Sequence, residues 1–590
     1  MKLADAIELA LTQRQRSLDG LKLTVVREGE LFKFTLKNTT AATARIGEFL
    51  LAEFQHGLAP ESALYGEGFS MFCSTAGTLA APEDVDSLTE VNHYRLVEPV
   101  GFHSCYNYMR LGIPGRMSAL VGFTSCRRFG GRFNFNAQTL QIVMNLEKIP
   151  LAPGEEVVLE ELMVAEDADA PLMMERFAAR IVGHHPRLNW DGVPNGWCSW
   201  YCYGPDISSK KILANLEAFQ THLPEVRYIQ IDDRLSALDG RLARVHGNVH
   251  GGVKQVIASI REAGFEPAIW VAPFVASPES RLFQEHPDWF VKDADGAPLN
   301  SGKVTFGGWR QGPWYILDGT HPEALAYLEE VFRTLHAWGC TYFKLDANVW
   351  GALPFGEHYD SKATAIEAYR RGMAAIRRGA GNSFILGCNQ PYWPSLGEIH
   401  GSRTSCDVFG NYETVARVAR ENLLRNWMND RLWWNDPDCI KLDALKPKSA
   451  SIELIGGDGK VQKDQGLTQN QVSFHMAATL ASGGMMLCGD AVIAYTPEQW
   501  RLLRILTTAP GIAATFADDR LEMGWINDGH ARHVVLLNWT KEPSQRKIRF
   551  DGDVRISDYW TKATLGDFTS EFNLELPPTA GRVLTLESIG

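Results

Sequence analysis

Long apolar runs are absent from the sequence. No uninterrupted apolar stretch is long enough to cross a bilayer, and Asp5 and Glu8 interrupt the apolar residues at the N-terminus, where a signal peptide would need a continuous core. We therefore expect a soluble, cytoplasmic protein without a membrane partner.

Clusters of basic residues are also missing. The net charge is −12 at pH 7, and no long Lys/Arg run provides the positive surface that binds a phosphate backbone. These features argue against nucleic acid as a partner.

Paired cysteines are a third absence. The ten cysteines occur singly, without the spacing of a metal site, and a chain of 590 residues is too large to need disulfides for stability. The pattern predicts free thiols in a reducing compartment, no bound metal and no cofactor.

The length exceeds what one hydrophobic core usually holds, so we expect two or three domains. Residues 1–185 contain short alternating apolar runs between Gly and Pro turns, which predict an antiparallel β-sandwich followed by a linker helix from Pro171. Residues 510–590 return to strand-like runs and predict a small C-terminal β domain.

Between these regions, in residues 186–509, strand-like runs alternate with amphipathic helical stretches eight times. Eight strand and helix units favour a (β/α)₈ TIM barrel over an open doubly wound sheet. The expected strands cover residues 195–200, 226–233, 266–273, 341–346, 383–388, 401–407, 432–436 and 485–490.

Carboxylates gather where these strands end. Barrel enzymes keep their chemistry at the carboxyl ends of the strands, so the same face of this barrel is expected to hold the active site. The acidic residues at these ends are Asp232, Asp233, Asp346, Asp407, Asp436 and Asp490.

The fourth strand suggests a reaction. Side chains alternate along a strand, so Lys344 and Asp346 share a face, and the ammonium group would favour an ionised, nucleophilic carboxylate. Glycoside hydrolysis needs a second, protonated carboxyl group. Asp407, with Arg403 on the same segment, is the best candidate, although structural aspartates also cap helices after barrel strands.

The longest loop, residues 274–320, carries Trp289, Trp309 and Trp314. Sugar faces stack on indole rings, so these residues could form a carbohydrate platform above the carboxylates. The alternative is that they pack the loop against the barrel.

Seven motifs together resemble those of microbial α-galactosidases of glycoside hydrolase family 36 (clan D), and they occur in the order of that family. They are Gly-Trp-Cys-Ser-Trp-Tyr at 196–201, Ile-Gln-Ile-Asp-Asp at 229–233, Ile-Trp-Val-Ala-Pro-Phe at 269–274, Glu-His-Pro-Asp-Trp at 285–289, Tyr-Phe-Lys-Leu-Asp at 342–346, Phe-Ile-Leu-Gly-Cys at 384–388 and Asn-Asp-Pro-Asp-Cys at 435–439.

The resemblance implies a retaining α-galactosidase that removes terminal α-galactosides from small oligosaccharides by double displacement. Asp346 would be the nucleophile and Asp407 the acid/base, while Asp232 and Asp233 would accept hydrogen bonds from the sugar O4 and O6 hydroxyls. The residues expected to line the same pocket are Trp270, Lys344, Cys388 and Arg403. The residues alone add Trp200 as a candidate, and leave a metal pair or a helix cap as alternatives for the two adjacent aspartates.

The chain departs from the family pattern in several places. Cys202 replaces a common histidine, and residues 389–393 replace a glycine-rich segment expected near the sugar C2 substituent, so N-acetylgalactosamine or another pyranose stays open as the glycone. Residues 446–465 have no counterpart and are either a lid or an inert insertion. Residues 65–69 could reach over the barrel mouth.

Other functions remain open on the sequence alone. A strand lysine can form a Schiff base, carboxylates at strand ends can hold Mg²⁺ in an enolase-like barrel, and a barrel can bind sugar without catalysis. A homo-oligomer is also left open.

Overall fold

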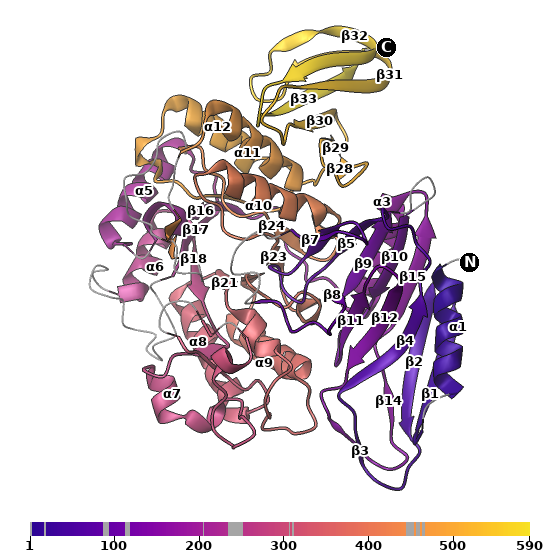
Figure 1. The fold of residues 1–590 in the computed structure, drawn as a ribbon. Coiled ribbons are helices and arrows are strands. Elements are labelled where there is room, and N and C mark those ends of the chain that lie inside the picture. The colour runs from indigo at the N-terminus through magenta and orange to yellow at the C-terminus, as the bar shows by residue number, and fades with distance from the viewer. Residues whose placement is uncertain are drawn as a thin grey trace.

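A computed structural model describes residues 3–16, 19–85, 94–112, 118–204, 206–233, 252–305, 307–308, 312–443, 454–455, 461–462 and 466–589. Figure 1 shows the N-terminal sheets beside the central barrel and the C-terminal sheet next to the barrel helices α11 (Gln469–Ser482) and α12 (Pro497–Thr507). None of the helices that the model describes is long and apolar enough to cross a membrane.

The N-terminal region consists of two antiparallel sheets behind helix α1 (Leu3–Arg16), which the sequence did not predict. The ring of Phe123 in the larger sheet stacks on that of Phe133 in the smaller one, with 5.2 Å between the ring centroids. The two sheets therefore share a core, as in a sandwich. The larger sheet runs β1 (Leu21–Glu28), β2 (Leu31–Asn38), β15 (Leu162–Asp167), β10 (Ser118–Phe123), β9 (Tyr108–Gly112), β5 (Ala63–Gly66), β6 (Thr75–Gly77) and β7 (Pro82–Asp84), with β14 (Glu156–Val158) beside β2. The smaller runs β4 (Glu48–Gln55), β12 (Thr139–Asn145), β11 (Gly130–Phe135) and β8 (His103–Tyr106).

The short strands β3 (Ala44–Arg45) and β13 (Pro150–Leu151) pair at the edge of this region. Helix α3 (Ala170–His184) then leads to the barrel; it begins with Asp169 as N-cap and carries Pro171 in its first turn, as predicted.

The barrel is confirmed, and each of its eight parallel strands falls within a predicted range. In sheet order they are β24 (Trp434–Asp436), β23 (Gly401–Arg403), β22 (Phe384–Gly387), β21 (Tyr342–Leu345), β18 (Glu266–Val271), β17 (Tyr228–Ile231), β16 (Asn195–Cys198) and β27 (Met486–Cys488). Between β24 and β27, the amide of Met485 donates to the carbonyl of Asn435 at 2.8 Å, so the barrel is nearly closed.

Helices cover the strands from outside. Threonine N-caps with a Glu or Gln three residues later begin α9, α11 and α12, and a left-handed Gly339 ends α8. The barrel helices are α4 (Trp200–Tyr203), α5 (Ser209–His222), α6 (Gly252–Glu262), α7 (Arg281–Glu285), α8 (Pro322–Trp338), α9 (Ala365–Ala380), α10 (Tyr412–Leu424), α11 (Gln469–Ser482) and α12 (Pro497–Thr507). Residues 388–400, all of them described, contain only the 3-10 helix η5 (Trp393–Ser395), which agrees with the prediction for this connection.

The C-terminal region is a six-stranded antiparallel sheet with a small core of its own, which includes Val534, Ile548 and Leu584. It rests on α11, where the amide of Gly581 donates to the hydroxyl of Ser473. Its strands are β28 (Thr515–Phe516), β29 (Met523–Asn527), β30 (Arg532–Leu537), β33 (Gly581–Ser588), β31 (Ser544–Asp558) and β32 (Thr564–Leu576).

The predicted contact of residues 65–69 with the barrel takes a definite form. Phe69 O accepts from Tyr392 N at 3.0 Å, so the segment meets the loop after β22. Glu67 forms a fully buried ion pair with Arg425 at 2.7 Å, and Arg425 also donates to the carbonyl of Thr404 at 2.7 Å. The N-terminal region thereby supports the loop that follows β23.

Part of the sequence lies outside the described residues. Within 446–465 only the paired strands β25 (Leu454–Ile455) and β26 (Val461–Gln462) are described, so the choice between a lid and an inert insertion is not tested. Trp309 also lies outside the described residues.

Candidate active site

The predicted site residues meet at the carboxyl ends of the barrel strands. Asp232 and Asp233 follow β17, Asp346 follows β21, and Asp407 lies four residues after the end of β23. Because β17 ends at Ile231, both of its aspartates lie beyond the alternation of the strand, which removes the constraint that would let only one face the pocket.

Asp232 and Lys344 form a buried ion pair of 2.9 Å. Gln230 Nε2 donates to the same Asp232 oxygen at 2.7 Å, and the amide of Asp233 donates to the other at 2.9 Å. Burial would lower the pKa of Lys344, but the charge of Asp232 raises it well above the ordinary value. Lys344 is therefore held charged, whereas a Schiff-base lysine must react as the neutral amine.

This pairing corrects the sequence-based prediction for Lys344. The ammonium group binds Asp232 on the neighbouring part of the barrel, and it acts on Asp346 only as a nearby charge. Strand periodicity places two residues on one face but does not say which acid on another strand is nearer.

Both oxygens of Asp346 accept fixed hydrogen bonds. Trp270 Nε1 donates to one at 3.0 Å, and the amide of Ala347 donates to the other at 2.7 Å. Ala347 has a left-handed backbone with φ of 54°, a costly conformation for a residue with a Cβ that is found at functional sites. The local chain is thus bent so that its amide reaches the carboxylate before it.

Lys344 lowers the pKa of Asp346 as predicted, but its effect is not the largest one. Burial raises the pKa of its carboxyl above the ordinary value, and the charge of Lys344 and the two hydrogen bonds offset this effect only in part. The sequence gives the sign of the neighbouring charge, whereas the net direction depends on burial, which only the fold determines.

Asp407 is held by two donors from different elements. Arg403 donates to one oxygen at 2.9 Å and Trp200 Nε1 to the other at 3.3 Å. Burial would raise the pKa of Asp407, but Arg403 and Lys344 outweigh it and hold that pKa below the ordinary value. This direction is opposite to the one expected for a protonated partner, and the role of Asp407 stays a prediction.

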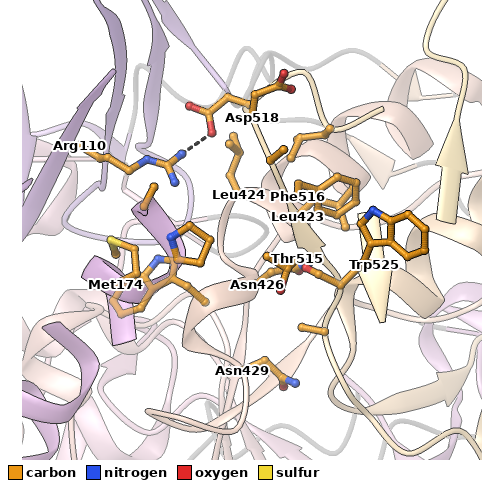
Figure 2. Close-up of a pocket in the computed structure, with 18 of the residues that line it drawn as sticks. Arg110, Met174, Leu423, Leu424, Asn426, Asn429, Thr515, Phe516, Asp518 and Trp525 are labelled. Atoms are coloured by element: carbon orange, nitrogen blue, oxygen red, sulfur yellow. Dashed lines mark hydrogen bonds and ion pairs between the residues drawn. The ribbon is translucent and has the colours of Figure 1, made fainter. Parts of the chain in front are cut away.

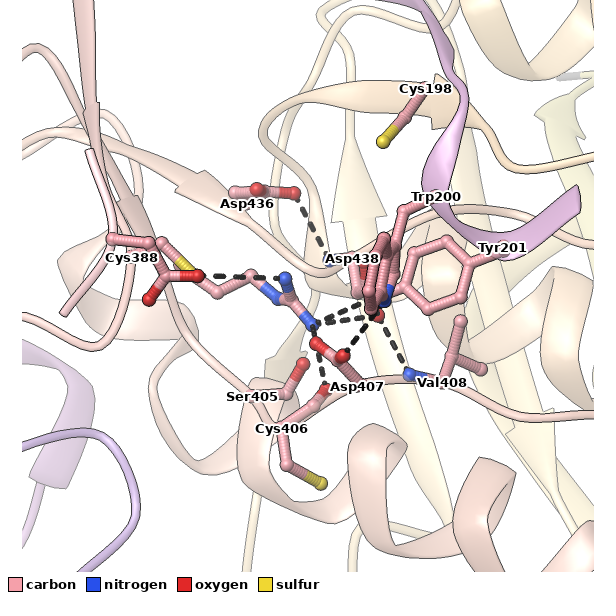
Figure 3. A network of polar contacts seen from close by, with 12 residues as sticks. Cys198, Trp200, Tyr201, Cys388, Ser405, Cys406, Asp407, Val408, Asp436 and Asp438 are labelled. Carbon is pink, nitrogen blue, oxygen red and sulfur yellow. Dashed lines mark hydrogen bonds and ion pairs between the residues drawn. The ribbon is translucent and has the colours of Figure 1, made fainter. Parts of the chain in front are cut away.

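Tyr201, Asp407 and Asp438 belong to one polar network (Figure 3), and Arg403 contacts all three. Its side chain is 1% exposed and pairs with Asp438 at 2.7 Å as well as with Asp407. It also donates to the hydroxyl of Tyr201 at 3.2 Å and lies 4.0 Å from the sulfur of Cys388. Burial raises the pKa of the Cys388 thiol well above the ordinary value, so this residue is neutral.

Sequence reasoning missed Tyr201 and Asp438. The Tyr201 hydroxyl donates to Asp438 at 2.5 Å, and the amide of Val408, next to Asp407, donates to the same oxygen at 2.7 Å. Both residues belong to the motifs at 196–201 and 435–439. The second acidic residue in Asn-Asp-Pro-Asp-Cys was the available signal. Its role depends on its contacts with Tyr201 and with the amide of Val408, which sequence spacing does not reveal.

Asp490 serves a structural role at the end of β27. Its carboxylate accepts from the amides of Leu442 and Asp443 at 2.6 and 2.9 Å and from Tyr495 at 2.7 Å. It fixes the loop after β24 to the last barrel strand.

Two of the three loop tryptophans follow the alternative of packing the loop. The ring of Trp289 stacks on that of His286, with 3.8 Å between the ring centroids, and its Nε1 donates to Glu323. Trp314 is 1% exposed and packs against Trp350. Their indole faces pack the loop rather than lie open to a sugar.

A large cavity lies away from these carboxylates. It has a volume of about 1380 Å³ between the N-terminal sheets, the end of α10 and residues 510–532, with Arg110, Trp427, Phe516 and Trp525 among its lining (Figure 2). None of the predicted site residues lines it, so the site is defined by the chemistry of the strand ends.

No three His, Cys, Asp or Glu side chains in the described part of the chain are grouped to hold a metal ion. Oxygens of Asp232, Asp346 and Asp407 instead accept from Lys344, Trp270 and Arg403. These donors favour an organic substrate over an enolase-like Mg²⁺ site.

Residues 230–375 match the family model Melibiase. The myogenesis-regulating glycosidase of Mus musculus is 27% identical over 161 residues, which cover 27% of this chain and 22% of that protein. The A type blood α-D-galactosamine galactosaminidase of Flavonifractor plautii is 28% identical over 204 residues, which cover 33% and 18%. The chain thus spans about a fifth of the length of the curated relatives it matches.

Two solved structures resemble the whole fold. The α-galactosidase of Thermus thermophilus has a TM-score of 0.60 at 20% identity, covering 87% of this chain and 98% of its own. A family 36 α-galactosidase of Geobacillus stearothermophilus has a TM-score of 0.62 at 12% identity, covering 97% and 82%. At such identities these likenesses show the fold alone.

The family model and the curated relatives thus make the barrel similar to α-galactosidase-type glycoside hydrolases. Structures from glycoside hydrolase family 27 are also similar to this chain, for example a family 27 enzyme of Geobacillus stearothermophilus with a TM-score of 0.54. The assignment to family 36 therefore stays a prediction.

Proposed function

We propose that the protein is a retaining α-glycosidase that hydrolyses terminal α-galactosides, with Asp346 as nucleophile and Asp407 as acid/base. The observation that carries this proposal is the pair of carboxylates at the ends of β21 and β23, each oriented by an indole N–H, with a charged Asp232–Lys344 pair beside them. Two carboxyl groups and a set of hydroxyl acceptors are what glycoside hydrolysis requires.

The reaction proceeds in two balanced steps. Asp346 attacks the anomeric carbon while Asp407 gives its proton to the departing glycosidic oxygen, which leaves a glycosyl ester on Asp346. Asp407 then takes a proton from water, and the resulting hydroxide attacks the same carbon and releases Asp346. Two inversions give net retention.

The fixed donors match this assignment. A nucleophile must be oriented before attack, and Trp270 and the amide of Ala347 hold both oxygens of Asp346. The charge of Lys344 and these two hydrogen bonds lower the pKa of Asp346 against the effect of burial, which favours an ionised nucleophile. The lowered Asp407, in contrast, needs a feature that helps it hold a proton.

Asp232 and Asp233 are proposed to bind sugar hydroxyls. Ionised oxygens accept hydrogen bonds from hydroxyl donors strongly, and an axial O4 needs its acceptor in a different place from an equatorial one. Because Lys344 and Gln230 occupy Oδ2 of Asp232, this carboxylate is already oriented before substrate arrives.

An α-N-acetylgalactosaminide is the second candidate substrate. Asn389 directly follows Cys388 in the segment expected near the C2 substituent, has φ of 45°, and its buried Oδ1 has no hydrogen-bond partner among the described residues. A free acceptor there would suit an amide N–H, and one curated relative is a galactosamine galactosaminidase.

A panel of nitrophenyl α-glycosides of galactose, N-acetylgalactosamine, glucose and arabinose tests the proposal, with and without EDTA. We expect the highest kcat/KM on the α-galactoside, unchanged by EDTA, and no turnover by Asp346→Ala. Lack of activity on every member, or loss in EDTA that Mg²⁺ restores, contradicts it.

A further inference from the structure

We propose that Asp438 is a positioning residue that shares the guanidinium of Arg403 with Asp407, so that the two carboxyls hold one proton between them and Asp407 can act as an acid. This inference rests on the proposed function of Asp407. It explains how a carboxyl paired with arginine can still donate a proton.

The geometry joins three elements around one cation. The same terminal nitrogen of Arg403 lies 2.9 Å from Asp407 and 2.7 Å from Asp438, and both the arginine and Asp438 are buried. One positive charge between two carboxylates can neutralise only one of them, so a second negative charge stays uncompensated next to the buried Asp438, although the Asp407 side chain itself is 36% exposed. Retaining one proton on the pair relieves this excess.

The surroundings of Asp438 favour shared titration. Burial raises the pKa of Asp438 to about 7, the neighbouring Asp407 and Asp436 add to this effect, and Arg403 opposes it. Tyr201 and the amide of Val408 both donate to Oδ2, so the carboxylate form remains accessible. Asp438 can therefore exchange its proton in the pH range in which hydrolysis would proceed.

Asp438 is also fixed in position. Its backbone is left-handed with φ of 72°, and its amide donates to Asp436 at 3.1 Å. Because Oδ2 also accepts from the amide that follows Asp407, Asp438 ties the end of β24 to the loop after β23. Asp438 is therefore both an ion-pair partner of Arg403 and the residue that holds the loop after β23.

Other ionisable groups face this pair from each neighbouring element. Lys344 lies on β21 and Asp346 in the turn after it. Cys388 follows β22. Glu421 of α10 accepts a hydrogen bond from the amide of Cys406, in the loop after β23. Further groups are Arg417 of α10, Cys439 after β24 and Cys198 of β16. Arg403 pairs with both carboxyls, and the hydroxyl of Tyr201 interacts with both as well.

The test is the pH dependence of kcat/KM for Asp438→Asn on an α-galactoside with a sugar leaving group. Asparagine keeps the size of the side chain but removes its charge, so Arg403 serves Asp407 alone and the proton on Asp407 is lost at lower pH. We expect the basic limb to move to lower pH by about one unit, which is roughly tenfold in kcat/KM above it. The α-nitrophenyl galactoside, whose leaving group needs little acid, should lose much less.

Asp318→Asn is the matched control. Asp318 is as buried as Asp438. Its carboxylate binds Thr320, His358 and Tyr359 instead of Arg403. Its basic limb should match that of the wild type. If kcat/KM of Asp438→Asn falls equally at all pH values and the basic limb does not move, the inference is overturned and the proposed function is unaffected. If the wild type has no activity on α-galactosides, the proposed function itself is contradicted.

A second measurement applies if Asp438→Asn does not fold. Infrared difference spectra of the wild type and Asp407→Asn follow the protonated carboxyl band across pH. In Asp407→Asn the remaining carboxyl has Arg403 to itself, so its deprotonation should shift to lower pH. An unshifted step contradicts a shared proton.

Discussion

At the residue scale, Asp346 combines a fixed orientation with a position at the end of a central strand. Removing its carboxylate should lower kcat by about 10⁴-fold or more, since the covalent route then lacks its nucleophile. Azide should restore turnover in Asp346→Ala by entering the vacated space and forming a β-glycosyl azide, which product analysis detects. Normal turnover of this variant excludes Asp346 as the nucleophile.

Asp407 gives a different residue-level signature. An acid matters most when the leaving group is poor, so Asp407→Ala should lose about 10²- to 10⁴-fold in kcat/KM on a raffinose-like sugar and far less on a nitrophenyl galactoside. The basic limb of the pH profile should flatten in the same variant. Equal losses on both substrates, with the limb unchanged, would contradict this role for Asp407 and shift it to Asp436.

The limits of prediction are also visible at this scale. The residue types at the strand ends could be read from the sequence because barrel chemistry occurs there. The partner of Lys344 and the pKa directions of Asp346 and Asp407 could not, since each depends on burial and on contacts between strands. The choice between a carbohydrate platform and packing of the loop could not be made from the sequence either. A loop tryptophan has the same sequence signal whether it packs against the protein or binds a sugar.

At the element scale, the eight strands were predictable because parallel strands buried on both faces form short apolar runs between helical patterns. The support of the loop after β23 was not, since it comes from the distant segment around Glu67. Arg425 of the barrel binds both Glu67 and the carbonyl of Thr404, which precedes the acid/base candidate by three residues.

Breaking this buried pair provides an element-scale prediction. Glu67→Ala leaves the Arg425 charge buried without its partner and should lower the free energy of unfolding by about 3 to 5 kcal/mol. Denaturant unfolding measures the loss. Glu285→Ala, which removes the exposed pair with Arg281, is the control and should change stability by less than about 1 kcal/mol. Equal small effects of the two substitutions would contradict a supporting role for the Glu67 pair.

At the scale of the whole molecule, the N-terminal sheets and the barrel are joined by buried polar contacts. Trp393 of the barrel donates to the carbonyl of Phe123 at 2.6 Å, in addition to the Glu67–Arg425 pair. The domain limits at residues 185 and 509, the cytoplasmic location and a homo-oligomeric state stay predictions.

The overall account requires that a sugar be bonded to Asp346 during the reaction. In Asp407→Ala an activated nitrophenyl α-galactoside can still form this ester, because its leaving group needs no acid, whereas hydrolysis of the ester lacks its base and slows. The intermediate should therefore accumulate. Wild-type enzyme treated in the same way is the control and should retain little of it.

Mass spectrometry of peptides from acid-quenched Asp407→Ala is therefore the most direct test. We predict one added hexosyl group on the peptide that contains Asp346, and none on that peptide when Asp346 is also replaced. A hexosyl group on Asp436 or Asp490, or product release with inverted configuration and no labelled peptide, would contradict the double displacement at Asp346.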